Sequence, residues 1–185
     1  MMIQFRLLLN ELNVAIDFLL LQSNFPSTFS FDDSMEINYF NIRVYGFLVD
    51  VGHVLVTDEF RLGIYMTKFP GGGLQFGEGA IDCLKREFME ELNTPIEIVS
   101  HFYTTDFYQP TTLLPSTMQL FNIYYLVKAE KPYSFMTTNA LNDIPPVDGA
   151  QSFRWVKIED LQEEDFTFPI DRFVVGMLKH SEVAR

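Results

Sequence analysis

Three glutamates, Glu87, Glu90 and Glu91, lie within five residues of one another in the segment GGGLQFGEGAIDCLKREFMEELN, residues 71–93. Carboxylate oxygens grouped in this way are typical ligands of Mg²⁺ or Mn²⁺, cations that also bind phosphate oxygens. Without a cation, neighbouring carboxylates raise one another's pKa values. Two interpretations follow: a site that holds a divalent metal ion against a phosphorylated ligand, or a charged helix face in contact with solvent.

The glutamates are expected on a single helix. Residues 80–92 are rich in helix formers and contain no Pro or Gly, and Pro95 follows shortly after them. At about 100° per residue, four apolar side chains fall in one stripe that we expect to be buried: Ile81, Leu84, Phe88 and Leu92. Cys83 falls opposite this stripe, and the glutamates flank it. The carboxylates are therefore expected at the edge of a cleft.

Arg86 and the glycines before the helix complete this group. Arg86 precedes Glu90 by four residues, so the two are expected to pair along the helix, and the arginine can also reach back toward the glycines. Gly71, Gly72 and Gly73 allow a close backbone approach and positive φ angles. Glu78 lies near the predicted helix start, where a negative charge suits the helix dipole.

The spacing resembles the signature of Nudix hydrolases, G-x5-E-x7-R-E-U-x-E-E-x-G-U, in which U is a bulky apolar residue. Its charged and glycine positions are filled by Gly72, Glu78, Arg86, Glu87, Glu90 and Glu91. At residue frequencies of roughly 7% each, chance would give this match on the order of once in 10⁵ sequences. Asn93 and Thr94 replace the last glycine and apolar residue. Because Asn also adopts left-handed conformations at helix ends, we expect the helix exit to be kept.

The resemblance implies an α/β/α sandwich with a mixed β-sheet, in which residues 72–94 form a loop–helix–loop box. It also implies hydrolysis of a nucleoside diphosphate linked to another group. By position, Glu87, Glu90 and Glu91 would bind Mg²⁺ or Mn²⁺, and Arg86 would orient the carboxylates. Catalytic roles are thereby implied for Glu87, Glu90 and Arg86, and the phosphate loop is implied at Gly71, Gly72, Gly73 and Glu78.

The resemblance leaves the general base and the substrate open. The base in this family is a glutamate of the box, here Glu87 or Glu90, or an acid from a distant loop. Asp143 and Asp148 are candidates of the second kind, although each also fits an ordinary loop. Some ADP-ribose-cleaving relatives carry a proline at a set distance past the box, and Pro110 lies at that distance. ADP-ribose and nucleotide sugars are thus candidate substrates, while a proline in a loop is usually only a turn.

The rest of the chain predicts strands and a second helix around the box. Alternating apolar residues on both sides of the sequence DVGH, residues 50–53, predict a β-hairpin. Pro169 opens a segment with helical spacing that extends to residue 180. Further strands are expected in residues 60–69, 96–108, 118–130 and 153–158. This order of elements indicates an α/β domain with helices packed on a mixed sheet.

Residues 1–34 fall outside the resemblance and are expected to form a helix over 3–22 and a linker, before a domain over 35–185. Polar residues interrupt every apolar run, so neither a signal peptide nor a membrane span of about 18 residues is predicted. The helix is expected to dock on the domain or on a second copy of the chain, giving a homodimer. Alternatively, Met35 is the natural start and the upstream residues contribute little.

Composition narrows the functional classes. The net charge of −12 and the pI near 4.5 argue against binding to polymeric nucleic acid, which needs a basic surface. A single cysteine, Cys83, allows no intrachain disulfide, so a cytoplasmic location is expected. Two other hypotheses remain: a non-catalytic nucleotide sensor with the same fold, and an interaction module that uses the N-terminal helix. Sensors of this fold usually carry a degraded box or an appended DNA-binding domain, neither of which is expected here, and the interaction module explains none of the spacing of the acids.

Overall fold

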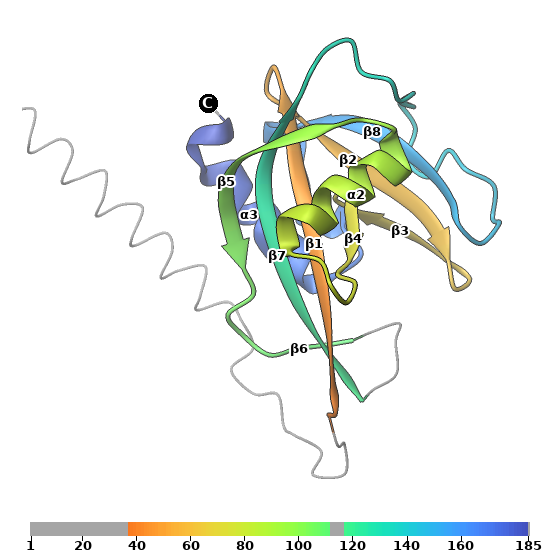
Figure 1. Ribbon diagram of the computed structural model, residues 1–185. Coiled ribbons are helices and arrows are strands. Elements are labelled where there is room, and N and C mark those ends of the chain that lie inside the picture. The colour runs from red at the N-terminus through yellow and green to blue at the C-terminus, as the bar shows by residue number, and fades with distance from the viewer. Residues whose placement is uncertain (1–36, 112–116, 185) are drawn as a thin grey trace, which may run out of the picture. The chain divides into compact units, whose positions relative to one another are not determined.

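The computed structural model describes residues 37–111 and 117–184, which form a mixed β-sheet with a helix on each face (Figure 1). The predicted N-terminal helix, the linker and the expected dimer contact lie outside the described residues.

The centre of the sheet is a parallel pair of long strands. β1 (Tyr39–Asp50) runs parallel to β7 (Met118–Ala129) in continuous register over ten residue pairs. β5 (Ile96–Thr104) and β6 (Gln109–Pro110) pair with β7, and β4 (Gly71–Gly73) pairs with β1, all three in the antiparallel direction. Strands of both directions in one sheet confirm the predicted mixed arrangement.

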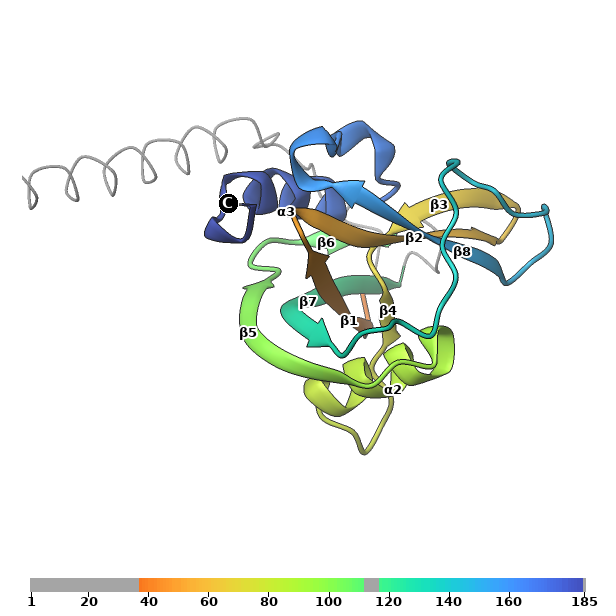
Figure 2. The ribbon, with the colours of Figure 1, turned by 90° about the horizontal axis from the view of Figure 1, so that it is seen from above.

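A second set of strands leaves β1 through the hairpin. β2 (His53–Arg61) pairs with β1 only at Val49↔Val54 and Asp50↔His53, which confirms the predicted turn. β2 then pairs with β3 (Ile64–Lys68) and β8 (Ala150–Lys157), both antiparallel. Seen from above, these three strands diverge from β1, β7 and β5 (Figure 2).

Alternating side chains of β1 divide the core into two layers. Tyr45 and Phe47 are buried with residues of α3 (Pro169–His180). Val44 and Leu48 are buried with residues of α2 (Ala80–Leu92). Because successive side chains of a strand point to opposite faces, one strand fills both cores. This is the α/β/α sandwich expected from the sequence.

The buried face of α2 differs from the predicted stripe at one turn. Its buried residues are Cys83, Leu84, Phe88 and Leu92, whereas Ile81 is 42% exposed. The Cys83 thiol donates a hydrogen bond to the Gly73 carbonyl at 3.5 Å, so this side of the helix faces β4. The sequence pattern alone did not reveal a strand on that side. The prediction for Cys83 and Ile81 was therefore wrong.

Two further segments differ from their predictions. The glycines Gly71–Gly73 form the short strand β4 instead of a loop, because β1 offers them a pairing edge. The strand predicted over 96–108 ends at Thr104, and the Tyr103 hydroxyl donates to the Asp106 carboxylate just beyond it. This contact closes a turn before β6.

Short 3₁₀ helices connect β8 to α3 and follow α3: η1 (Ile158–Asp160), η2 (Glu163–Asp165) and η3 (Glu182–Ala184).

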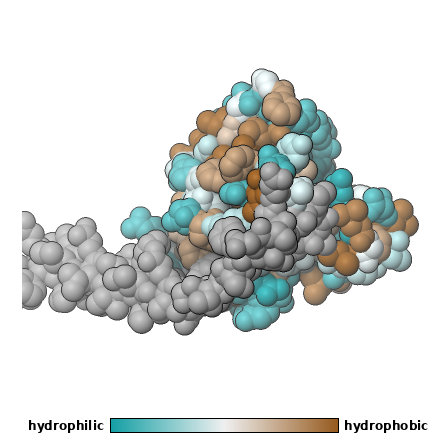
Figure 3. Space-filling view, turned by 90° about the horizontal axis from the view of Figure 1, so that it is seen from below, coloured by the Kyte–Doolittle hydropathy of each residue, from teal (hydrophilic) through white to brown (hydrophobic). Residues whose placement is uncertain are grey.

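On the face seen from below, hydrophobic and hydrophilic residues lie close together (Figure 3). Within residues 37–111 and 117–184, no helix is both long enough and apolar enough to cross a membrane.

A buried ion pair joins the strands of the second set. The Asp58 carboxylate on β2 is fully buried and accepts hydrogen bonds from Arg154 Nε at 2.5 Å and Nη2 at 3.0 Å. It also accepts from the Thr67 hydroxyl at 2.7 Å and from the Asn142 N–H at 3.1 Å. One side chain therefore links β2, β3, β8 and the loop before β8.

Asp58→Ala is expected to lower the free energy of unfolding by about 3–5 kcal/mol, because it leaves the Arg154 guanidinium without its buried partner. Arg154→Met added to Asp58→Ala should restore part of the loss. Urea denaturation followed by circular dichroism measures both. Glu97→Ala, which removes an exposed ion pair with Lys128, is the control and should cause a much smaller loss. An equally small loss for Asp58→Ala would contradict the expectation.

Candidate active site

The absence of a side chain at Gly72 brings the box helix against β4. Val44 pairs with Gly72 in the β1–β4 ladder. A Cβ atom on Gly72 would lie 2.4 Å from the carboxyl carbon of Glu87. Gly71 has a φ of +135°, and a Cβ there would lie 2.2 Å from the Val44 carbonyl oxygen. Gly72 therefore lets the Glu87 carboxylate pack directly on the strand backbone, and Gly71 lets β4 approach β1.

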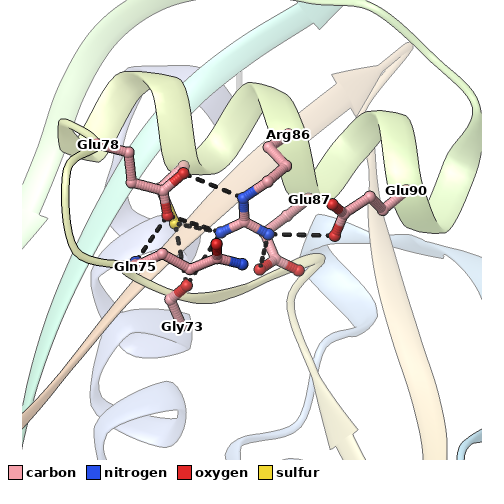
Figure 4. A network of polar contacts seen from close by, with 7 residues as sticks. Gly73, Gln75, Glu78, Arg86, Glu87 and Glu90 are labelled. Atoms are coloured by element: carbon pink, nitrogen blue, oxygen red, sulfur yellow. Dashed lines mark hydrogen bonds and ion pairs between the residues drawn. The ribbon is translucent and has the colours of Figure 1, made fainter.

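Arg86 connects the loop before α2, the helix and β4 (Figure 4). Its Nε and Nη2 donate to the two carboxylate oxygens of Glu78 at 3.0 and 2.7 Å. Nη1 donates to Glu87 at 2.7 Å and to Glu90 at 3.1 Å, and Nη2 also donates to the Gly73 carbonyl at 3.1 Å. The predicted pairing with Glu90 and the reach to the glycines are confirmed.

Glu78 fixes both Arg86 and the loop. The bidentate contact with Arg86 lowers the pKa of Glu78 to about 2, so its carboxylate stays ionised at any pH at which the protein is handled. Its Oε1 also accepts a hydrogen bond from the Gln75 N–H at 2.7 Å (Figure 4). The residue predicted for the phosphate loop thus holds residues 75–78 in a turn.

The end of α2 keeps the exit expected from the signature despite its two substitutions. Asn93 adopts a left-handed conformation with φ 47° and ψ 40°, and its N–H donates to the Met89 carbonyl at 3.1 Å. Thr94 is buried, and its hydroxyl donates to the Leu92 carbonyl at 2.9 Å. Asn93 therefore ends the helix as a glycine would, and Thr94 adds a hydrogen bond where the signature has an apolar contact.

Glu91 is the least satisfied carboxylate of the box. Its Oε2 is buried and has no hydrogen-bond partner among the described residues. Burial raises the pKa of Glu91 to about 7, and the charges of Glu87 and Glu59 add to this effect. Lys68 and a backbone hydrogen bond from Gly71 act in the opposite direction. A buried oxygen in this state is stabilised by a cation.

The carboxylates of the box offer only oxygen atoms as ligands for a divalent cation. In the described part of the chain, no three His, Cys, Asp or Glu side chains are gathered in the arrangement of a metal site. Arg86 instead holds Glu87 and Glu90, while Glu91 lies buried with an unpaired oxygen. The available ligands are all hard carboxylate oxygens, and one of them lacks any partner. By its chemistry this set suits Mg²⁺ or Mn²⁺, although the described side chains do not stand in a coordinating arrangement.

A pocket of about 270 Å³ opens between β1, β2, β3 and β7. Within it, Lys68 and Glu59 form an ion pair at 2.7 Å, with side chains that are 6% and 8% exposed. Lys68 also interacts electrostatically with Glu91, so the pocket adjoins the box. Its lining residues include Asn41, Arg43, Tyr45, Arg61, Leu120 and Asn122.

The pocket was not predicted from the sequence. Its charged residues come from three strands and share no local spacing, so only the strand register brings them together. The one available signal was the isolated charge of Arg43 inside the apolar strand segment 42–49, and it equally suits an ordinary edge position.

The two loop acids predicted as candidate bases lie in other surroundings. Asp148 Oδ1 accepts a hydrogen bond from the Leu62 N–H at 2.8 Å, at the β2–β3 turn. Asp143 is exposed, and within the described residues no hydrogen bond or ion pair connects either acid to the box. Pro110 forms β6 and pairs with Gln119, next to the pocket residue Thr111.

The raised pKa of Glu91 predicts a pH-dependent stability. Between about pH 4.5, the ordinary pKa of a glutamate, and about pH 7, Glu91 keeps its proton in the folded protein and loses it in the unfolded protein. The contribution of protonated Glu91 to the free energy of unfolding is therefore complete below pH 4.5 and is lost as the pH rises through 7. In EDTA, Glu91→Gln, which resembles the protonated form, should exceed the wild type by about 1–3 kcal/mol at pH 8 and match it at pH 4.

Urea denaturation at both pH values measures this difference. Glu97→Gln is the control of opposite sign, because Lys128 lowers the pKa of Glu97, and this variant should lose stability at pH 8. Wild type and Glu91→Gln that respond identically to pH would show that the Glu91 carboxyl is not held as described.

Comparison with known proteins was made at the level of sequence and of structure. Residues 39–175 match the model of the NUDIX domain family. No curated protein sequence matched the chain. Among solved structures, a NUDIX hydrolase from Nitrosomonas europaea is 16% identical, with a TM-score of 0.57 over 76% of this chain and 88% of that one.

Two other solved structures share the fold. A UDP-X diphosphatase is 11% identical with a TM-score of 0.53, over 80% of this chain and 67% of that one. An ADP-ribose pyrophosphatase from Streptococcus suis is also 11% identical, with a TM-score of 0.51, over 77% of this chain and 93% of that one. The family match covers the sheet, the box and most of α3, and the structural likeness agrees with it. The chain is therefore an enzyme of the Nudix hydrolase family.

Proposed function

We propose that this Nudix enzyme is a Mg²⁺- or Mn²⁺-dependent pyrophosphohydrolase. It cleaves the bond between the two phosphorus centres of a nucleoside diphosphate linked to another group. The observation that carries the proposal is the buried, unpaired oxygen of Glu91, which lies beside Glu87 and next to a pocket lined by basic residues. This arrangement suits a cation on one side and phosphate groups on the other.

Glu87, Glu90 and Glu91 would hold the cation. When bound, such a cation neutralises phosphate charge and activates water for attack on phosphorus. Glu91, with a pKa near 7, readily gives up its proton at neutral pH when a positive charge arrives. Its Oε2, which has no hydrogen-bond partner among the described residues, would be one of the oxygens that hold the cation.

Arg86 acts as a positioning residue in this proposal. Its guanidinium holds the Glu87 and Glu90 carboxylates and is itself held by Glu78. The general base is assigned to a glutamate of the box, Glu87 or Glu90. Asp148 is less suitable because one of its oxygens already accepts a hydrogen bond from the Leu62 N–H at the β2–β3 turn.

The pocket supports a substrate with a polar group attached to the diphosphate. Its volume of about 270 Å³ suits a base or a sugar, and Arg43, Arg61 and Lys68 suit anionic oxygens. ADP-ribose and nucleotide sugars are the substrates we propose, and two proteins of the same fold are named an ADP-ribose pyrophosphatase and a UDP-X diphosphatase. The buried single cysteine is consistent with a reducing compartment such as the cytoplasm.

Glu91→Gln is expected to lower kcat by at least about 10²-fold, because several kcal/mol of charge stabilisation are lost with the carboxylate. The assay is a panel of ADP-ribose, nucleotide sugars, nucleoside triphosphates and dinucleotides with millimolar Mg²⁺ or Mn²⁺, followed by identification of the products.

Asp82→Asn is the matched control, since this exposed acid lies on the same helix outside the signature. It should retain wild-type turnover. Binding of a nucleotide without any turnover by the wild type would instead support the non-catalytic sensor.

Gly72→Ala is expected to lower kcat by about 10²-fold with little change in the unfolding midpoint. The new Cβ occupies the position of the Glu87 carboxyl group and displaces it, whereas the φ angle of Gly72 lies outside the left-handed region. Gly79→Ala is the control, because a Cβ there meets only ordinary contacts, the nearest at 3.4 Å. Full activity of Gly72→Ala would show that Glu87 need not pack on the strand.

A further inference from the structure

Arg43 has an incompletely used guanidinium beside the active site. Its Nε donates to the Tyr45 hydroxyl oxygen at 2.6 Å. Within the described residues, its Nη1 and Nη2 atoms have neither a hydrogen-bond acceptor nor a carboxylate at ion-pair distance. The guanidinium therefore presents two free nitrogens in a fixed plane.

The position of Arg43 lies between the box and the pocket. Arg43 pairs with Gly73 in the β1–β4 register, and its Nη1 is 3.9 Å from the position that a Cβ of Gly73 would take. It lines the pocket and interacts electrostatically with Glu87 on one side and Glu59 on the other. An anion that spans from the box into the pocket would pass this guanidinium.

Among the described residues, no carboxylate lies at ion-pair distance from Arg43, although Glu87 and Glu59 interact with it from farther away. Glu59, the acidic residue of the pocket lining, is already paired with Lys68 at 2.7 Å and with Arg61 at 3.6 Å. Arg43 is therefore a positive charge without a direct ion pair in the described part of the chain, in a protein whose net charge is −12. A half-buried guanidinium that is not neutralised by the protein favours binding of an anion.

Tyr45 keeps the guanidinium in place. The Tyr45 side chain is 2% exposed, and its ring stacks on Tyr124 with centroids 5.4 Å apart. Tyr124 is itself anchored, because its hydroxyl donates to the buried Asp171 carboxylate at 2.7 Å. The hydrogen bond from Nε to Tyr45 thus fixes the plane of the Arg43 fork relative to the core.

We propose that Arg43 binds the substrate phosphate on the pocket side of the diphosphate, through Nη1 and Nη2. This inference rests on the proposed function and adds to it a phosphate-binding residue outside the box. The planar fork of arginine matches two phosphate oxygens, whereas a lysine offers only a point charge. Tyr45 is the positioning residue that orients the fork.

The test compares Arg43→Gln and Arg43→Lys with the wild type on the best substrate of the panel. Arg43→Gln is expected to raise KM roughly 10- to 100-fold, the effect of losing charge-assisted hydrogen bonds. Arg43→Lys should fall between that variant and the wild type. A third variant, Arg43→Ala, leaves space for a free guanidinium ion. Millimolar guanidinium chloride should restore part of its activity, a response that a purely structural residue would not give.

Tyr45→Phe tests the positioning role, and Lys128→Gln is the control. Tyr45→Phe should raise KM by a smaller factor than Arg43→Gln, without rescue by guanidinium. Lys128→Gln removes the same charge from an exposed ion pair outside the pocket and should keep the wild-type KM. Thermal unfolding of every variant shows whether it is folded. If Arg43→Gln does not fold, Arg43→Lys still tests the role of the guanidinium.

Calorimetry with methylenediphosphonate and Mg²⁺ separates this inference from the proposed function. The analogue should bind Arg43→Gln at least about 10-fold more weakly than the wild type. If the panel shows hydrolysis but Arg43→Gln keeps the wild-type KM and affinity for the analogue, the role of Arg43 is wrong and the proposed function stands. If no substrate is hydrolysed while the affinity still depends on Arg43, the proposed function fails and the anion site stands.

Discussion

The guanidinium of Arg86 is the interaction on which the candidate active site depends. It contacts a carboxylate from the loop, two carboxylates from the helix and a carbonyl from β4. Without it, Glu87 and Glu90 would repel each other next to the buried Glu91, and the loop would lose its bond to the helix. The lack of side chains in β4 makes this grouping of carboxylates sterically possible. The positive charge of Arg86 makes it electrostatically stable.

The box helix and the strands that line the pocket contribute opposite charges. α2 supplies the acids, and the strands of the pocket supply most of the bases, although the chain as a whole is strongly acidic. Lys68 connects the helix with these strands, because it pairs with Glu59 and also interacts electrostatically with Glu91. A diphosphate that crosses this boundary would meet positive charge on the side of the pocket and, with a metal ion bound, on the side of the box.

The features that the sequence predicted correctly depend on the spacing of residues that are close together in the chain. The helix over Ala80–Leu92, the exit at Asn93 and the pairing of Arg86 with Glu90 all depend on residues near one another in the sequence. The pocket depends on strand register across distant segments, so Arg43, Glu59 and Lys68 carried no recognisable pattern. The burial of Cys83 was missed for the same reason, since β4 packs on a side of the helix that periodicity alone assigns to solvent.

The burial of Cys83 makes its chemical modification a measure of the movement of α2. Its thiol is buried against β4, and burial together with the charge of Glu78 raises its pKa to about 12. A thiol in this state is protonated and inaccessible, so alkylating reagents and oxidants reach it only when α2 moves away from the sheet. Because the sequence contains no other cysteine, the rate of its modification reports a single event, the opening of the catalytic helix.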